Sequence, residues 1–269
     1  MLNNSDRTTV TDKKFDADEA GTRYANRLFL RLVAKDKSFT KVDFKYTIFD
    51  SCYLRGCKFD SCDFTGCRFV GTNLHGSKFS GCRFDYAVFE RTSVDSDILD
   101  TECPGPENLK QRFARTLRMN YQQLGDAAAA NKAMIIELEA TEAHLHKAWY
   151  SNEAYYRKKY HGWFRIKAWL EWLGFKLLDF VWGNGEYLYR LVRAVLVVLL
   201  AMTIFEVVEY DDPQRLSSYI SAFESSFAVF IGVLTPPQYA KWYLAAVTLV
   251  RLVAMSFFLS IIIKKFNRR

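Results

Sequence analysis

Residues 62–71 read CDFTGCRFVG, two consecutive blocks of five residues with a phenylalanine at the centre of each block. The same period continues in both directions without a skip. The twelve central residues are Phe39, Phe44, Phe49, Leu54, Phe59, Phe64, Phe69, Leu74, Phe79, Phe84, Phe89 and Val94. A period of five matches neither an α-helix nor a flat strand, whose side-chain patterns repeat every 3.6 and 2 residues. The backbone must therefore turn a corner once in every block.

A small residue stands two positions before most of these centres. This second series is Thr47, Cys52, Cys57, Cys62, Cys67, Thr72, Ser77, Cys82, Ala87 and Thr92, with Lys37 and Val42 departing from it at the N-terminal edge. Five of the six cysteines belong to it, and we expect them to fill the core as small hydrophobic side chains. Metal binding is the alternative, but successive cysteines would lie on different faces of a square coil. Reduced thiols fit this pattern better than a disulfide framework.

These blocks resemble the pentapeptide-repeat family. The resemblance implies a right-handed quadrilateral β-helix with four repeats per coil, about three coils, and a spacing between coils of about 4.8 Å. Cys62 and Cys82 would then stack on one face. Some members of the family are acidic rods that mimic DNA and bind topoisomerases. Between Lys41 and Arg91, however, eight basic and six acidic residues are interspersed, so charge disfavours that function here.

A helical region follows the repeats. The chain is broken at Cys103-Pro104-Gly105-Pro106, and from residue 107 apolar residues recur at spacings of three and four. The pattern predicts helices over 107–124 and 127–150, packed as an antiparallel pair around a Gly125-Asp126 turn. His144 and His146 face different sides of the second helix, where we expect both to be solvated.

Residues 155–182 mix aromatic and basic side chains. Five of the six tryptophans lie between Trp149 and Trp182, among lysines and arginines such as Arg157, Lys167 and Lys176. Such a mixture can stack single-stranded nucleic acid. It also describes amphipathic helices in the headgroup layer of a membrane. Because an apolar segment follows at once, we favour the membrane interpretation and expect no nucleic-acid partner.

Two apolar segments, Leu191–Val208 and Trp242–Ile263, have 18 and 22 residues. The uncharged centre of the first covers only 12 residues, which is short for a membrane span, whereas the second is long enough. A buried helix pair in a soluble protein is the alternative interpretation.

The charges that flank these segments favour two membrane spans. Arg190 and Arg193 lie at the start of the first segment, and Lys264, Lys265, Arg268 and Arg269 follow the second. The acidic residues Glu206, Glu209, Asp211 and Asp212 lie between them. The positive-inside rule then places both termini in the cytoplasm.

The chain between the spans, Ser217–Tyr239, contains an apolar run too short to cross a membrane. A half-helix followed by extended chain is tolerated there only where it lines a protein-buried or watery cavity. The pattern therefore predicts a re-entrant loop. Its pore-like or filter-like residues are Ser226, Ile231, Gly232, Val233, Leu234, Thr235 and Pro236.

This layout resembles the two-transmembrane pore domain of tetrameric potassium-type channels, which some bacterial proteins carry behind pentapeptide repeats. Gly183-Asn184-Gly185-Glu186 before the first span adds to the resemblance, which implies a homotetramer. The potassium filter sequence TVGYG is absent, so the ion selectivity is expected to differ from the standard potassium type.

One arginine, Arg251, lies within the second span. A charge at the bilayer centre costs at least about 2.5 kcal/mol, so such an arginine usually faces protein or water. Glu224 in the loop and Glu206 at the end of the first span are its candidate partners. Snorkelling to the outer headgroups is the alternative.

The sequence thus predicts a mixed architecture. We expect a flexible N-terminus at 1–23, the β-helix with an N-terminal cap at 24–100, a helical hairpin linker at 101–154, interfacial amphipathic helices at 155–186 and a two-span α-helical membrane domain with a re-entrant pore loop at 187–269. Met1–Asp18 is polar, so no secretory signal is expected there.

The functional hypothesis is an oligomeric pore or ion channel of the inner membrane, with a cytoplasmic β-helix that regulates it and can bind a protein partner. Without a nucleophile–base pair, a phosphate-binding glycine loop or clustered carboxylates, we expect neither an enzyme nor a metal or cofactor site. A non-conducting membrane-anchored scaffold or sensor is the alternative, as is an effector that depolarises its own cell.

Overall fold

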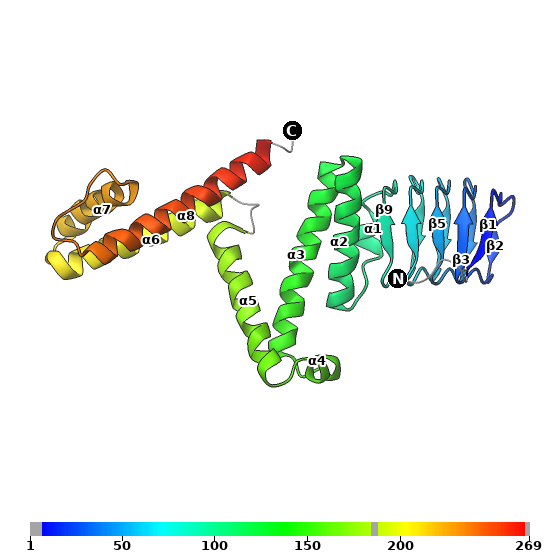
Figure 1. Ribbon diagram of the computed structural model, residues 1–269, viewed down its shortest axis with the longest axis horizontal. Coiled ribbons are helices and arrows are strands. Elements are labelled where there is room, and N and C mark those ends of the chain that lie inside the picture. The colour runs from blue at the N-terminus through cyan, green and yellow to red at the C-terminus, as the bar shows by residue number, and fades with distance from the viewer. Residues whose placement is uncertain (1–6, 184–187, 267–269) are drawn as a thin grey trace. The chain divides into compact units, whose positions relative to one another are not determined.

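The computed structural model describes residues 7–183 and 188–266, apart from the side chains of Trp182, Lys264 and Lys265. The chain divides into two compact units, Met1–Trp169 and Leu170–Arg269. The first holds a β-solenoid and a helical pair, and the second holds two long helices with a shorter helix between them in sequence, preceded by the end of another helix (Figure 1). Each unit is described by itself.

The solenoid has four faces, two of which are parallel sheets. One sheet contains β1 (Thr8–Thr11), β3 (Arg27–Leu30), β5 (Ile48–Asp50), β7 (Arg68–Val70) and β9 (Val88–Glu90). The other contains β2 (Glu19–Ala20), β4 (Ser38–Thr40), β6 (Lys58–Asp60) and β8 (Lys78–Ser80). Single β-bridges join successive coils on the remaining two faces. Phe49 pairs with Phe69 and Phe59 with Phe79, so the predicted coil of four repeats is confirmed.

The solenoid starts earlier than the sequence pattern suggests. It begins at β1, inside the segment 1–23 for which we expected a flexible terminus, and has about four turns instead of three. The first coil is one residue shorter than the others, because Val10 pairs with Phe29 whereas Phe29 pairs with Phe49. Phe15 therefore falls out of phase, yet it is buried and packs 5.5 Å from Phe39 between ring centroids.

The core of the solenoid is a set of stacked phenylalanine columns. Phe64 lies nearly parallel to Phe44 and Phe84, with ring centroids 5.2 and 5.0 Å away. Phe69 stands in the same relation to Phe49 and Phe89, at 5.0 Å from each. These distances follow from the coil repeat, since each coil lies one strand spacing above the previous one.

The small residues of the second series hold the coils together by hydrogen bonds as well as by packing. Cys57 and Cys67 donate their thiols to the carbonyls of Ala34 and Phe44, each at 2.9 Å. Thr72 donates its hydroxyl to Phe49 at 3.0 Å. Burial raises the pKa of Cys52 and Cys57 to about 11, so these thiols stay protonated and able to donate. The prediction that the cysteines fill the core is confirmed for Cys52, Cys57, Cys62 and Cys67, whereas Cys82 is half-buried at the edge of that core, and the structure adds their role as donors.

A helical hairpin follows the last coil, beyond the short helix α1 (Ile98–Thr101). The predicted pair is confirmed as α2 (Glu107–Leu124) and α3 (Ala127–Tyr150). Gly125 ends α2 in the left-handed conformation, with φ of 76°, and Asp126 caps α3 by accepting from the amide of Ala129. Glu137 of α3 accepts hydrogen bonds from both Arg115 and Arg118 of α2, at 2.8 and 2.7 Å.

The helix α2 covers the open end of the solenoid (Figure 1). Its Phe113 lies 5.6 Å from Phe84 between ring centroids. Its buried Asn120 accepts from the amide of Thr92 at 2.7 Å and donates to the carbonyl of the same residue at 2.8 Å. Thr116 accepts from the amide of Phe89 at 2.9 Å. These side chains form the hydrogen bonds that a further coil would otherwise make with the backbone of the last coil. A capping element of a repeat protein must supply such partners.

Two helices follow the hairpin, α4 (Ala154–Lys159) and α5 (Trp163–Trp182). The expectation that His144 is solvated is wrong, because its ring is half-buried and lies within 3.3 Å of the Tyr156 hydroxyl and 3.1 Å of the Tyr160 hydroxyl. Burial lowers the pKa of His144. His146 is exposed, as expected.

Beyond the end of α5, the second unit contains α6 (Leu188–Tyr210), α7 (Leu216–Ile231) and α8 (Lys241–Phe266). The predicted helical segments are confirmed, and α6 and α8 are long and apolar enough to cross a membrane. Their shared core contains Leu199, Met202, Val229, Phe230, Tyr239 and Val247. Arg190 and Arg193 of α6 donate to the carbonyls of Asp179 and Phe180 at 3.1 and 3.0 Å, near the end of α5. Cations are favoured at this end of a helix.

Candidate functional site at the end of α7

The short helix α7 lies between the two long helices in sequence and packs against both. It has 16 residues, or about 24 Å of helix, and ends at Gly232, whose φ of 88° is left-handed. The amides of Gly232 and Val233 both donate to the carbonyl of Ala228, which closes the last turn. The chain then returns to α8 without regular structure. A glycine after an apolar helical run is a usual stop signal, and it marks the end of α7 here.

The filter-like residues do not form one cluster within a single chain. Ile231, Val233, Leu234 and Thr235 are exposed, and Val233 is the most exposed of them at 81%. Pro236 is buried. Ser226 is also buried and faces α6, where its hydroxyl donates to Glu206 at 3.2 Å. Ser226 thus joins α7 to the first long helix and does not lie with the exposed residues.

The expected pairing of Arg251 with an acidic residue does not occur among the residues that the structure describes. Glu224 is exposed, and Glu206 accepts from Ser226. The guanidinium of Arg251 lies against Gly232 instead, since a Cβ added to that glycine would overlap Nη1 and lie 3.0 Å from Cζ. The axial offset between α7 and α8 explains this difference. Glu224 precedes Gly232 by eight residues, or about 12 Å of helix, and so lies well away from the guanidinium.

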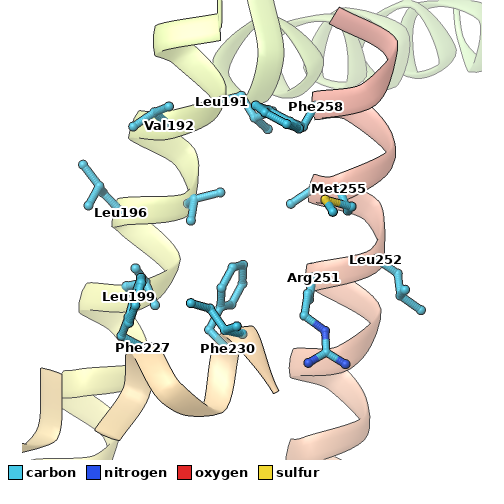
Figure 2. Close-up of a pocket in the computed structure, with 13 residues that line it drawn as sticks. Leu191, Val192, Leu196, Leu199, Phe227, Phe230, Arg251, Leu252, Met255 and Phe258 are labelled. Carbon is cyan, nitrogen blue, oxygen red and sulfur yellow. The ribbon is translucent and has the colours of Figure 1, made fainter. Parts of the chain in front are cut away.

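A pocket of about 590 Å³ opens beside Arg251 (Figure 2). Residues of α6, α7 and α8 line it, and every lining residue except Arg251 is apolar. Its walls are formed by Leu191, Val192, Val195, Leu196 and Leu199 of α6, Phe227, Phe230 and Ile231 of α7, and Leu252, Ala254, Met255 and Phe258 of α8. No sequence motif marks these residues, because their convergence depends on how the helices pack.

The contact between Gly232 and Arg251 makes a testable prediction. Gly232→Ala should destabilise the C-terminal unit by at least about 1–2 kcal/mol, because alanine disfavours the left-handed conformation and its Cβ would also displace Arg251. The loss should be smaller in an Arg251→Ala background, where the collision is absent. Denaturation of the detergent-solubilised protein with SDS measures both changes.

The control for backbone strain alone is Gly125→Ala, at a φ of 76° where a Cβ would meet nothing within 4 Å. Equal losses for Gly232→Ala with and without Arg251 would show that the arginine moves aside at little cost and that backbone strain accounts for the effect, and no loss in either background would contradict the prediction.

Within the described ranges 7–183 and 188–266, no group of three or more histidine, cysteine, aspartate and glutamate side chains is arranged to hold a metal ion. The described residues of the C-terminal unit thus present an apolar pocket with the cation of Arg251 beside the end of α7.

Comparison with known proteins identifies the solenoid. The family model described as Pentapeptide repeats (8 copies) matches residues 38–76 and 47–85. No curated protein matches this sequence closely enough to count as a relative.

Among solved structures, a pentapeptide repeat protein (Rfr23) from the cyanobacterium Cyanothece 51142 is 12% identical over 33% of this chain and 58% of its own, with a TM-score of 0.27. QnrB1, a plasmid-mediated fluoroquinolone resistance protein, is 16% identical over 34% of this chain and 62% of its own, with a TM-score of 0.25. This chain thus spans less than two thirds of either structure. A pentapeptide repeat protein from the thylakoid lumen of Arabidopsis thaliana is 16% identical over 35% of this chain and 72% of its own, with a TM-score of 0.15.

The residues that the family model matches lie in the coils of the solenoid. In these coils the central residue of each repeat pairs with the central residue four repeats later, and the small residues point inward. The N-terminal unit of this protein therefore carries a pentapeptide-repeat domain.

Proposed function

We propose that this protein is an oligomeric membrane pore whose pentapeptide-repeat domain regulates it from the cytoplasm of a bacterial cell. In this proposal α6 and α8 cross the inner membrane, α7 enters it from outside, and copies of the chain, four by analogy with channels of this layout, enclose a path for ions. The pentapeptide-repeat domain offers a surface for a cytoplasmic protein partner.

The observation that carries the proposal is the end of α7. An apolar helix too short to cross stops at Gly232 beside an arginine of α8, and chain that is exposed at residues 233–235 leads back to α8. Irregular backbone at membrane depth is tolerated where it is covered by protein or lines water. At the axis of an oligomer, neighbouring copies would cover the return segment on one side and a water-filled path would lie on the other.

The exposure of the long helices supports a membrane setting. Only 33% of the most apolar stretch of α6 and 11% of that of α8 is buried. A helix pair in the core of a soluble protein would bury most of these side chains. The remaining apolar surface requires lipid or further copies of the chain to cover it.

Recording from the purified full-length protein in a planar bilayer tests conduction. We expect discrete current steps, and Val233→Glu should shift the reversal potential in asymmetric salt toward cation selectivity, because Val233 lies on the exposed return segment. Leu216→Glu is the matched control, since Leu216 is 78% exposed but lies at the start of α7. Absence of current at any voltage would favour the non-conducting scaffold or sensor. Equal shifts for both variants would place the ion path elsewhere.

The direction of insertion makes a separate prediction. In intact cells, a membrane-impermeant thiol reagent should label Gln214→Cys, which lies in the exposed loop between α6 and α7. It should label Gln122→Cys, an exposed position of α2, only after lysis. The native cysteines of the repeats donate hydrogen bonds inside the solenoid and provide little background. The reverse labelling pattern would invert the topology.

An effector that depolarises its own cell is the alternative. It would form the same pore, but opening of that pore would collapse the membrane potential of the cell. Loss of membrane potential and arrested growth on expression, abolished by the same substitutions that abolish current, would favour it over a housekeeping channel.

A further inference from the structure

The pocket beside Arg251 has the composition of a binding site for an apolar ligand with one negative charge. Binding sites for small molecules typically have volumes of 300–1,000 Å³, apolar walls and a few polar groups that orient the ligand. This pocket has a volume of about 590 Å³ and a single charged lining residue. In Figure 2, Arg251 stands at one end of the pocket, while Leu191 and Phe258 stand at the other.

The guanidinium at that end has no anionic partner among the described residues of the chain. Across residues 7–183 and 188–266, Arg251 forms no ion pair and no hydrogen bond, and its close neighbour is the backbone of Gly232. The end of α7 carries only the partial negative charge of a helix C-terminus, and its carbonyl at Ala228 already accepts from Gly232 and Val233. A full charge left unpaired among apolar side chains is costly, so an anion brought by a ligand would be stabilised here.

We propose that this pocket binds a single-chain amphiphilic carboxylate, such as a long-chain fatty acid. Its carboxylate accepts hydrogen bonds from the guanidinium of Arg251. Its alkyl chain lies between α6 and α8, against Val192, Leu196, Met255 and Phe258, and ends near Leu191. This site does not depend on conduction and would exist in a non-conducting protein as well.

The depth of Arg251 favours a single-chain acid over a phospholipid. Arg251 is ten residues from Lys241, or about 15 Å along α8, which is near the middle of a span of this length. A phospholipid would have to bring its whole headgroup to this depth, where the pocket offers one cation and no other polar side chain. A fatty acid brings one carboxylate, which one guanidinium satisfies.

Depth also argues against a second copy of the chain as the occupant. The nearest acidic residue that another copy could present from its own α7 is Glu224, about 12 Å along the helix from Gly232. Rotation about the membrane normal leaves the depth of every residue unchanged. Glu224 of one chain would therefore lie about 12 Å above or below Arg251 of the next chain, too far to pair with it.

The test uses the full-length protein in phosphatidylcholine nanodiscs and a palmitate analogue with a photoreactive diazirine near the end of its chain. We expect saturable labelling that maps by mass spectrometry to the pocket-lining stretches of α6 and α8. Arg251→Met should raise the half-saturating concentration by about tenfold or more, the change expected from losing a charge-assisted hydrogen bond. Arg251→Lys should restore most of the binding, because the cation is retained. Unlabelled palmitate should compete at least tenfold better than its methyl ester.

A matched pair of variants separates the pocket from the charge. Met255→Trp should fill the pocket and abolish labelling, whereas Leu259→Trp, which is similarly exposed on α8 but does not line the pocket, should leave it unchanged. All variants are first compared with the parent by size-exclusion chromatography.

Other outcomes would overturn the proposal. Equal competition by the acid and its methyl ester, or unchanged labelling of a well-folded Arg251→Met, would exclude an anionic ligand at Arg251. Better competition by phosphatidylglycerol than by palmitate would assign the pocket to a phospholipid. Labelling that is unaffected by Met255→Trp would place the bound acid elsewhere. Absence of current in the bilayer alongside normal labelling would overturn the pore and leave this site standing.

Discussion

Replacing Phe64 with alanine is expected to lower the free energy of unfolding of the solenoid by about 3–5 kcal/mol. Phe64 is 1% exposed and lies in the middle of a column, stacked on Phe44 and on Phe84. Its removal loses the transfer free energy of a buried ring and leaves a cavity that its neighbours cannot fill. The backbone beside Phe44, Phe64 and Phe84 is held by the bridges of Asp63 to Asp43 and to Arg83, and the adjacent faces are held by strand pairing, so the coils cannot collapse into the space.

Hydrogen exchange of the full-length protein measures this effect locally. The opening free energies of amides in β5 to β8 should fall by the stated amount, while those in α6 and α8 should not change. Tyr86→Ala is the control within the same repeats, because Tyr86 is 53% exposed and its loss should change stability by less than about 1 kcal/mol. Equal effects of the two substitutions would contradict the burial of Phe64.

The second large effect is expected at the capped end of the solenoid. Asn120→Ala should destabilise the last coil by about 2–4 kcal/mol, because it leaves the buried amide and carbonyl of Thr92 without partners. A buried polar group without a partner costs about 1–3 kcal/mol. Asn120→Asp should recover only part of the loss, since a carboxylate accepts from the amide but cannot donate to the carbonyl.

Gln123→Ala is the matched control for Asn120→Ala. Gln123 lies on the same helix and also accepts from a terminal amide, that of Arg91 at 3.1 Å, but it is exposed and water can replace it. We expect a change within about 0.5 kcal/mol. Exchange rates of amides in β7 and β9 report both substitutions, and a small effect at Asn120 would show that α2 covers the coil without supporting it.

The period of five was sufficient to predict the coil. Each inward residue contacts its counterparts one coil before and one coil after. Every block therefore needs a residue of similar size at the same position, and this requirement appears in the sequence as the repeat. The end of α2 and the start of α3 were also predictable, because Gly125 acts locally as a stop signal for α2 and Asp126 as a cap for α3.

The first coil was not predictable from that period. Its pairing is one residue shorter, which moves Phe15 out of phase, and Ala34 interrupts the series of large central residues. Phe15 is recognisable as a core residue only through its packing on Phe39 and Tyr24. His144 is a similar case, since its contacts come from α4, which folds back beside α3.

By itself, the sequence determined the repeat, the helices and the presence of an arginine within a long apolar segment. These features follow from local period and composition, which any stretch of chain displays without its neighbours. Only the tertiary structure decided that Arg251 meets Gly232 rather than Glu224, that Ser226 meets Glu206, and that the walls of the pocket converge on one cation. A sequence states how far each residue lies along its own helix, but the axial offset between packed helices depends on how all their side chains fit together.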